Sequence, residues 1–159
     1  MPPRRPHPSP AITAGAAAPG PWRSRIVGEA EVSPETLARN PLNWRTHPDP
    51  QRRALAGALD QLGWIQRIVV NRTTGHVVDG HLRVALALES HAPTVPVLYV
   101  DLDPEEERLA LATIDPITGM AGVDLETLNT LVGEIGLDGL PQDAALQDLL
   151  AGLVKPEPQ

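Results

Sequence analysis

Apolar residues in the middle of the chain come in short runs separated by polar residues, and their spacing alternates between that of strands and that of helices. Runs of apolar and β-branched residues predict strands, whereas apolar residues that recur at roughly every third or fourth position predict helices. Strands are therefore expected at residues 25–32, 67–70, 76–79 and 94–100. Helices are expected at 33–39, 49–62, 82–89, 103–113, 124–135 and 142–153. This order predicts an α/β (α+β) fold, a small mixed sheet with surrounding helices and a C-terminal helical extension.

Residues with special backbone preferences mark the ends of several elements. Gly63 follows the apolar stripe of the second expected helix and is expected to end it. The segment 71–75, NRTTG, predicts a hairpin turn between two strands. Pro96 cannot donate a backbone hydrogen bond, so it predicts an edge position or a bulge for the last strand. Residues 103–106, DPEE, combine a cap, a proline and an acid at a helix start, and the segment 114–122 beyond that helix is expected to be a loop.

Composition divides the chain into three parts. Residues 1–22 are rich in proline and alanine and are expected to form a disordered tail, because they cannot bury enough apolar surface. Residues 23–122 hold the mixed strands and helices and form the expected domain. Residues 123–159 are expected to be an acidic helical extension with a frayed C-terminus.

Charge and cysteine content exclude several classes of function. The net charge of −7 argues against nucleic-acid binding over the whole surface. Arginine is nevertheless concentrated in residues 39–83, while residues 101–159 are mostly acidic. The absence of cysteine excludes disulfides, thiolate metal sites and cysteine nucleophiles. No apolar run approaches the roughly 18 residues of a membrane span, so a soluble intracellular protein is expected.

The stretch VVDGHLRVALAL, residues 77–88, carries the main candidate chemistry. A strand that passes through a glycine into a helix presents unpaired backbone N–H groups and the positive end of the helix dipole, which favours an anion. Gly80 allows a phosphate to approach the backbone closely, and His81 and Arg83 add hydrogen-bond donors for it. Asp79 is a candidate metal or ribose contact. The alternative is an ordinary turn whose His and Arg side chains face solvent.

Three further segments recur with DGHLR in one family in this order: NPLNWR, GWIQRIVV and VPVLYVDLDPEEERLALA. Together they resemble the ParB/sulfiredoxin superfamily, specifically the ParB-like N-terminal (ParB-like nuclease) domain of the phage and mobile-element type. The resemblance covers residues 25–122. Two positions depart from the family pattern: Arg67 replaces a proline, and Leu82 replaces a basic residue of the phosphate-binding box. The absence of cysteine excludes sulfiredoxin chemistry.

The resemblance implies a site for a nucleoside triphosphate, CTP or ATP, with Mg²⁺. The implied phosphate-binding residues are Gly80, His81 and Arg83. The pocket would be completed by Arg45, Gln66 and Asn43. Asp79 is the implied candidate for a catalytic carboxylate. No group of His, Asp and Glu has the spacing of a zinc site, so no dedicated metal site is expected.

Three functions follow from the resemblance. The first is a nucleotide-binding module acting in DNA partition, modification or regulation in a phage or mobile element. The second is an enzyme on the same fold, a DNA nuclease, a small-molecule kinase or a weak NTPase. The third is an adaptor with a vestigial pocket, whose acidic helices dock a DNA methylase or another phage protein. Nucleotide, DNA and a second copy of the chain are the implied partners, in the cytoplasm of a bacterium or phage-infected host.

Overall fold

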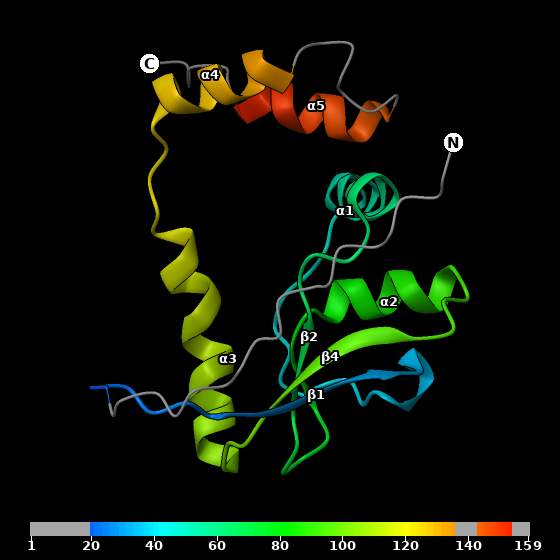
Figure 1. Ribbon diagram of the computed structural model, residues 1–159, viewed down its shortest axis with the longest axis vertical. Coiled ribbons are helices and arrows are strands. Elements are labelled where there is room, and N and C mark those ends of the chain that lie inside the picture. The colour runs from blue at the N-terminus through cyan, green and yellow to red at the C-terminus, as the bar shows by residue number, and fades with distance from the viewer. Residues whose placement is uncertain (1–19, 136–142, 154–159) are drawn as a thin grey trace, which may run out of the picture.

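The computed structural model describes residues 20–135 and 143–153 (Figure 1). The tail expected at 1–22 and the frayed end lie almost entirely outside the described residues. The centre of the structure is a four-stranded sheet in the order β1-β4-β2-β3. β1 and β4 are antiparallel, β4 and β2 parallel, and β2 and β3 antiparallel. The strands are β1 (Ile26–Val32), β2 (Ile68–Asn71), β3 (Val77–Asp79) and β4 (Val95–Val100). The expected mixed sheet and α+β class are thus confirmed.

The described residues also form a short 3₁₀ helix and five α-helices. They are η1 (Pro34–Thr36), α1 (Asp49–Leu62), α2 (His81–Glu89), α3 (Pro104–Gly119), α4 (Leu125–Ile135) and α5 (Ala144–Leu153). In Figure 1, α2 lies along the sheet and α1 lies beyond α2, while α3 leads from the opposite end of the sheet to α4 and α5. α5 packs against α1. None of the helices in the described residues is long and apolar enough to cross a membrane.

The hydrophobic core lies between the sheet and α2, and it is built from aliphatic side chains. Its buried members are Ile68, Val70, Val77, Val84, Ala87, Val95 and Val97. Because β2, β3 and β4 supply most of this cluster, the end of β3 and the start of α2 are held on a rigid support. The candidate site lies at this junction.

Pro96 does not mark an edge strand, which corrects one expectation. β4 lies inside the sheet, between β1 and β2. Pro96 is the second residue of β4 and pairs with Glu31 of β1, whereas the pairing with β2 begins only at Val97. Because Pro96 precedes the residues of β4 that pair with β2, its missing N–H costs no hydrogen bond to β2.

The segment 114–122 is not the expected loop, because α3 continues to Gly119 with Pro116 inside it. Proline disfavours a helix interior because it lacks the N–H that would bond to the preceding turn. Contacts from another part of the chain hold this helix: Trp44 Nε1 donates to the Leu111 carbonyl at 3.0 Å, and Arg45 forms an ion pair with Asp115. The expected helix at 33–39 is also shorter, since only Pro34–Thr36 is helical and Ala38 bridges to His76.

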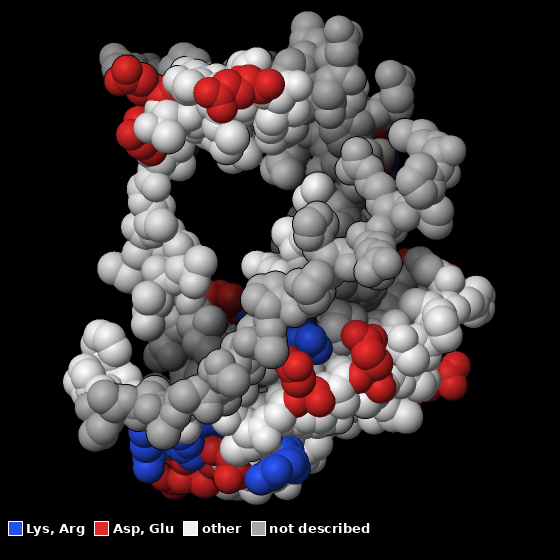
Figure 2. Space-filling view, viewed as in Figure 1, with Lys and Arg blue, Asp and Glu red and all other residues white. Residues whose placement is uncertain are grey.

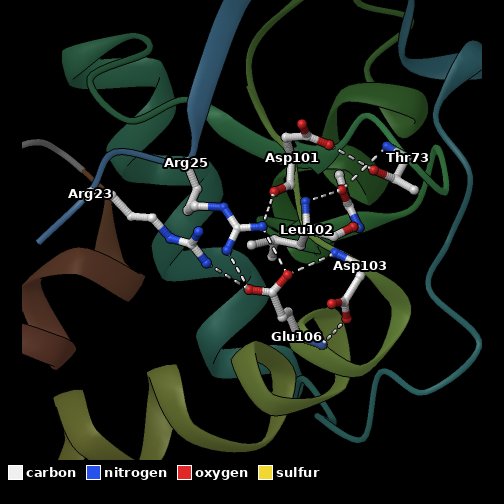
Figure 3. Close-up of polar contacts among 8 residues, drawn as sticks. Arg23, Arg25, Thr73, Asp101, Leu102, Asp103 and Glu106 are labelled. Atoms are coloured by element: carbon white, nitrogen blue, oxygen red, sulfur yellow. Dashed lines mark hydrogen bonds and ion pairs between the residues drawn. The ribbon is translucent and has the colours of Figure 1, made fainter.

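The start of α3 is fixed to β1 by an arginine and a glutamate (Figure 3). Asp103 and Glu106 form the expected capping box, in which each side chain accepts from the other residue's backbone N–H. In Figure 3 the Arg25 guanidinium points at Glu106, to which it donates, and at the Asp101 carbonyl, to which it donates at 2.5 Å. The Arg25 hydrogen bond is the main reason why the pKa of Glu106 is lowered to about 2.

A buried acid joins the β2–β3 hairpin to the same helix. Glu107 is 6% exposed and Asn71 is fully buried. Asn71 Nδ2 donates to Glu107 Oε1 at 3.1 Å, Thr74 Oγ1 donates to the same oxygen, and His76 Nδ1 lies 3.3 Å from the other. This hydrogen bonding compensates for the burial of a carboxylate.

Candidate functional site

The junction between β3 and α2 requires glycine at position 80 for two reasons. Gly80 caps α2 in the left-handed backbone conformation, at φ 97°, which residues with a Cβ rarely adopt. A Cβ added there would also lie 3.2 Å from Cγ1 of Ile68, in the core. The sharp turn therefore places the first amides of α2 directly above the sheet, with no side chain of residue 80 in front of them.

A cavity of about 260 Å³ opens beside this junction, and its charged lining is entirely basic. Three residues predicted for the site line it: Asn43, Arg45 and His81. Three further lining residues were not predicted: Arg39, His47 and Arg52. The floor is apolar and comes from Leu37, Val77, Leu82, Val84, Ala85 and Leu88. Such a concentration of cations at an indentation attracts anions, even though the whole chain is acidic.

Arg45 is held beside the junction by two carboxylates. Its guanidinium lies 3.6 Å from Asp79, the last residue of β3, and forms an ion pair with Asp115 of α3. Asn43 shapes the loop that carries Arg45, because Asn43 Oδ1 accepts the backbone N–H of Arg45 at 3.4 Å. The predicted neighbours Asp79, Arg45 and Asn43 are thus brought together. Asp115 was not predicted, because a loop was expected there.

His81 is a half-buried, neutral imidazole. Burial is the main reason why its pKa is lowered to about 4, and the charges of Arg45 and Arg39 lower that pKa further. Nε2 accepts the backbone N–H of Asn40 at 3.4 Å, so the proton of the neutral ring resides on Nδ1. At neutral pH, His81 therefore offers an anion one N–H donor but no positive charge.

Asn40 does not line the cavity, but its backbone N–H holds the imidazole of His81. It is 2% exposed, and its Oδ1 accepts the Leu42 N–H at 3.0 Å. Its Nδ2 is buried and has no hydrogen-bond partner within the described part of the chain. Because a buried donor without a partner is costly, this amide has an unused capacity to bind an oxygen.

Arg83 and Gln66 lie apart from this cavity, on the other flank of the junction. The Arg83 guanidinium donates to Gln66 Oε1. Both side chains line a second, smaller cavity of about 90 Å³ with Trp64 and apolar residues of α1. One Nη atom of Arg83 lies 3.6 Å from the position that a Cβ of Gly80 would take. The predicted set is thus divided, with Arg45 and His81 on one side of the junction and Arg83 on the other.

The three unpredicted residues of the cavity lining all lie close in sequence to the NPLNWR segment, which is only a weak indication of their place in the site. Arg39 and His47 lie on either side of the NPLNWR segment, and Arg52 follows in the first turn of α1. Arg52 forms an ion pair with Glu89 at the end of α2. Arg39 is exposed and forms no ion pair with any described residue. Sequence spacing alone does not reveal that the loop and the helix converge on one cavity.

The sequence matches no family model and no curated protein. Its fold is similar to that of the C-terminally truncated chromosome-partitioning protein ParB from Caulobacter crescentus, in a crystal structure with CTP-γ-S. The TM-score is 0.58 at 21% sequence identity, over 82% of this chain and 81% of that chain. The chain has a ParB-like fold. The resemblance to ParB found in the sequence is thus confirmed for the fold.

Two other ParB structures show lower similarity. A Pnob8-like ParB-N domain gives a TM-score of 0.48 at 24% identity, over 64% of this chain and 41% of that chain. The Caulobacter protein complexed to the centromeric parS site gives 0.46 at 20% identity, over 80% of this chain and 73% of that one.

Within this ParB-like fold, the two departures from the family pattern have structural reasons. Leu82 is 5% exposed and forms part of the cavity floor, a position where a basic side chain would be buried without a partner. Arg67 is exposed and its Nε lies 3.4 Å from Glu29 of β1, so it joins β2 to the outer strand on the surface. Among the described residues, no three His, Asp or Glu side chains are grouped as metal ligands.

Proposed function

We propose that this chain is a ParB-like nucleotide-binding module that holds the phosphates of a nucleoside triphosphate at the β3–α2 junction. One observation carries the proposal: the cavity beside this junction is lined by three arginines and two histidines and by no carboxylate. Arg45 and Arg52 are paired with acids that do not line the cavity, and Arg39 forms no ion pair with any described residue. The cavity therefore presents basic donors and no carboxylate of its own, which suits an anion.

The groups around the junction suit phosphate oxygens. The unpaired amides at the start of α2 and the helix dipole favour negative charge. Arg45 provides a planar donor fork on one flank, and Arg83 provides a second fork on the other. The Nδ1–H of His81, which lines the cavity, is a further donor. Mg²⁺ would arrive already bound to the triphosphate, because no group of metal ligands is present among the described residues.

The size of the cavity limits what it encloses. Small-molecule pockets commonly measure about 300–1,000 Å³, and this one measures about 260 Å³. It therefore suits the phosphates, with the nucleoside extending over the rim. CTP is the first candidate, because the Caulobacter ParB of the same fold was crystallised with CTP-γ-S.

Binding is favoured over catalysis at this site. Asp79, the candidate catalytic carboxylate, lies 3.6 Å from Arg45, so it is engaged with that arginine rather than free to face a substrate. Nuclease or kinase activity, contact with DNA, a methylase or a phage protein, and a homodimer stay predictions from the sequence resemblance.

The proposal is tested by isothermal titration of the whole chain with CTP, ATP, GTP and CMP in the presence of Mg²⁺. The informative variant is Arg39→Gln, because Arg39 lines the cavity but forms no ion pair that its loss would break. Arg53→Gln is the matched control, since it removes one exposed arginine of α1 that does not line the cavity. We expect Arg39→Gln to weaken triphosphate binding about tenfold, equivalent to 1.4 kcal/mol, and Arg53→Gln to leave it unchanged. Absence of binding, or equal weakening by both variants, would contradict the proposal.

A further inference from the structure

The C-terminal helix α5 returns to the part of the molecule that carries the site. It packs against α1 (Figure 1). The contact is close at one point: a Cβ added to Gly57 of α1 would lie 2.6 Å from a carboxylate oxygen of Asp143, the residue that precedes α5. Gly57 therefore provides the space in which the start of α5 is seated.

The space beneath α5 leads to Arg83. A cavity of about 620 Å³ separates the two helices and is lined from the α1 side by Pro50, Gln51, Ala54, Leu55 and Ala58. Arg83 of α2 and Asp148 of α5 both line this cavity. No ion pair between described residues joins Arg83 and Asp148. α5 thus contributes an acid to the cavity that Arg83 also lines.

α5 packs only loosely against α1. None of its described side chains is buried, and Leu149 and Leu153 remain 48% and 43% exposed. Because the hydrophobic contribution scales with the apolar area removed from water, a helix seated in this way can be displaced at low cost.

The charge of this region opposes an anionic ligand. Residues 124–135 and 143–153 contain acids and no lysine or arginine, and Figure 2 shows acidic side chains over α4 at the top of the molecule. A polyphosphate that reached Arg83 through this cavity would enter a space that the carboxylate of Asp148 also lines. The ligand and the seated helix therefore disfavour each other through both space and charge.

We propose that α5 is an acidic lid on the Arg83 flank of the phosphate site and must leave α1 before the ligand can engage Arg83. This inference rests on the proposed function. The apparent affinity for the triphosphate is then reduced by the fraction of molecules in which the lid is seated. In turn, bound triphosphate lowers the fraction of molecules with α5 on α1, since the coupling is reciprocal.

A reversible covalent lock tests the lid in the full-length chain, which has no cysteine of its own. An added Cβ at Gly57 would lie 2.7 Å from Cγ of Asp143. Because that Cγ is bonded to the Cβ of residue 143, the two Cβ atoms of Gly57→Cys and Asp143→Cys would lie close to the roughly 3.5–4.5 Å separation found in disulfides. We expect the oxidised variant to bind Mg²⁺-CTP at least about fivefold more weakly than the same variant after reduction. Equal affinities in the two states would overturn the lid and leave the proposed function standing. Absence of binding in wild type and in both states would overturn the proposed function, and the lid with it.

A charge variant tests the same lid without a change of backbone or packing. Asp148→Asn removes the acid that lines this cavity with Arg83, and Glu134→Gln removes an acid of α4 that does not line it. We expect Asp148→Asn to tighten Mg²⁺-CTP binding about threefold or more, as expected for removing a nearby like charge, and Glu134→Gln to leave it within error. Equal effects of the two substitutions would show a general charge effect and contradict the lid.

Discussion

The guanidinium of Arg45 lies 3.6 Å from the carboxylate of Asp79, one residue before the glycine at which β3 turns into α2. Arg45 also forms an ion pair with Asp115 of α3. These two acids orient the arginine beside the amides of α2, but they also neutralise part of its charge. A ligand phosphate would therefore compete with Asp79 and Asp115 for the same donor fork.

Substitutions of this pair should change anion affinity in opposite directions. Arg45→Gln removes the fork and leaves both acids near the junction, so we expect triphosphate binding to weaken by roughly tenfold or more, the equivalent of a charged hydrogen bond. Asp79→Asn frees Arg45 and removes a negative charge, so binding should tighten. Titration of both variants checks this. If Asp79 instead served as a catalytic base, Asp79→Asn would abolish turnover measured under the same conditions.

Gly80→Ala should damage the junction more than an equivalent change in the hairpin turn. The left-handed backbone costs an alanine roughly 1–2 kcal/mol, and at position 80 its Cβ would also press on Ile68 at 3.2 Å. Gly75→Ala is the control, because Gly75 has a similar φ of 74° with nothing within 4 Å. Urea denaturation should show a larger loss of unfolding free energy for Gly80→Ala. Equal losses would show that the contact with Ile68 is relieved at no cost.

The neutral state of His81 predicts a loss of stability in mild acid. Its pKa falls from 6.5 in the unfolded chain to about 4 in the native state. Since the unfolded chain binds the proton first, the native state loses stability as the pH falls from about 6.5 to about 4, and this group adds no further loss below that. With allowance for its partial exposure, the effect is on the order of 1 kcal/mol. The pH dependence of unfolding should be shallower over this range for His81→Gln, whose amide oxygen can replace Nε2 as acceptor.

The Arg25–Glu106 pair in Figure 3 predicts a separate acid sensitivity at lower pH. The pKa of Glu106 is lowered from 4.5 to about 2, mainly by its hydrogen bond from Arg25. This contribution to stability is therefore fully present above about pH 4.5 and is lost as the pH falls toward 2. The difference in unfolding free energy between wild type and Glu106→Gln should shrink across that range. A difference that stays constant from pH 6 to pH 2.5 would exclude the ion pair as its source.

Local signals in the sequence were sufficient where the neighbouring residues alone decide the structure. Gly63 ends α1, with φ 73° and its N–H bonded to the Leu59 carbonyl, and the capping box of Asp103 begins α3. The turn at Gly80 follows in the same way from its place between a strand and a helix.

Distant contacts decided the features that the sequence did not reveal. α3 continues through Pro116 because two residues of the loop before α1 bind it: Trp44 donates to the Leu111 carbonyl and Arg45 pairs with Asp115. His81 and Arg83 were predicted to share one pocket, but residues two positions apart on a helix do not face the same side. The cavity lining adds Arg39, His47 and Arg52, which converge only when the loop before α1 is folded over α2.

The most direct test of the central claim is to follow the backbone amides of the ¹⁵N-labelled full-length chain during titration with Mg²⁺-CTP. If the phosphates bind at the β3–α2 junction, the amide signals of Gly80, His81 and Leu82 should shift with the same dissociation constant as that of Arg45. The signals of the hairpin turn at residues 72–75 should remain in place as an internal control. Saturable binding that leaves the amides of residues 80–82 unchanged would contradict the account.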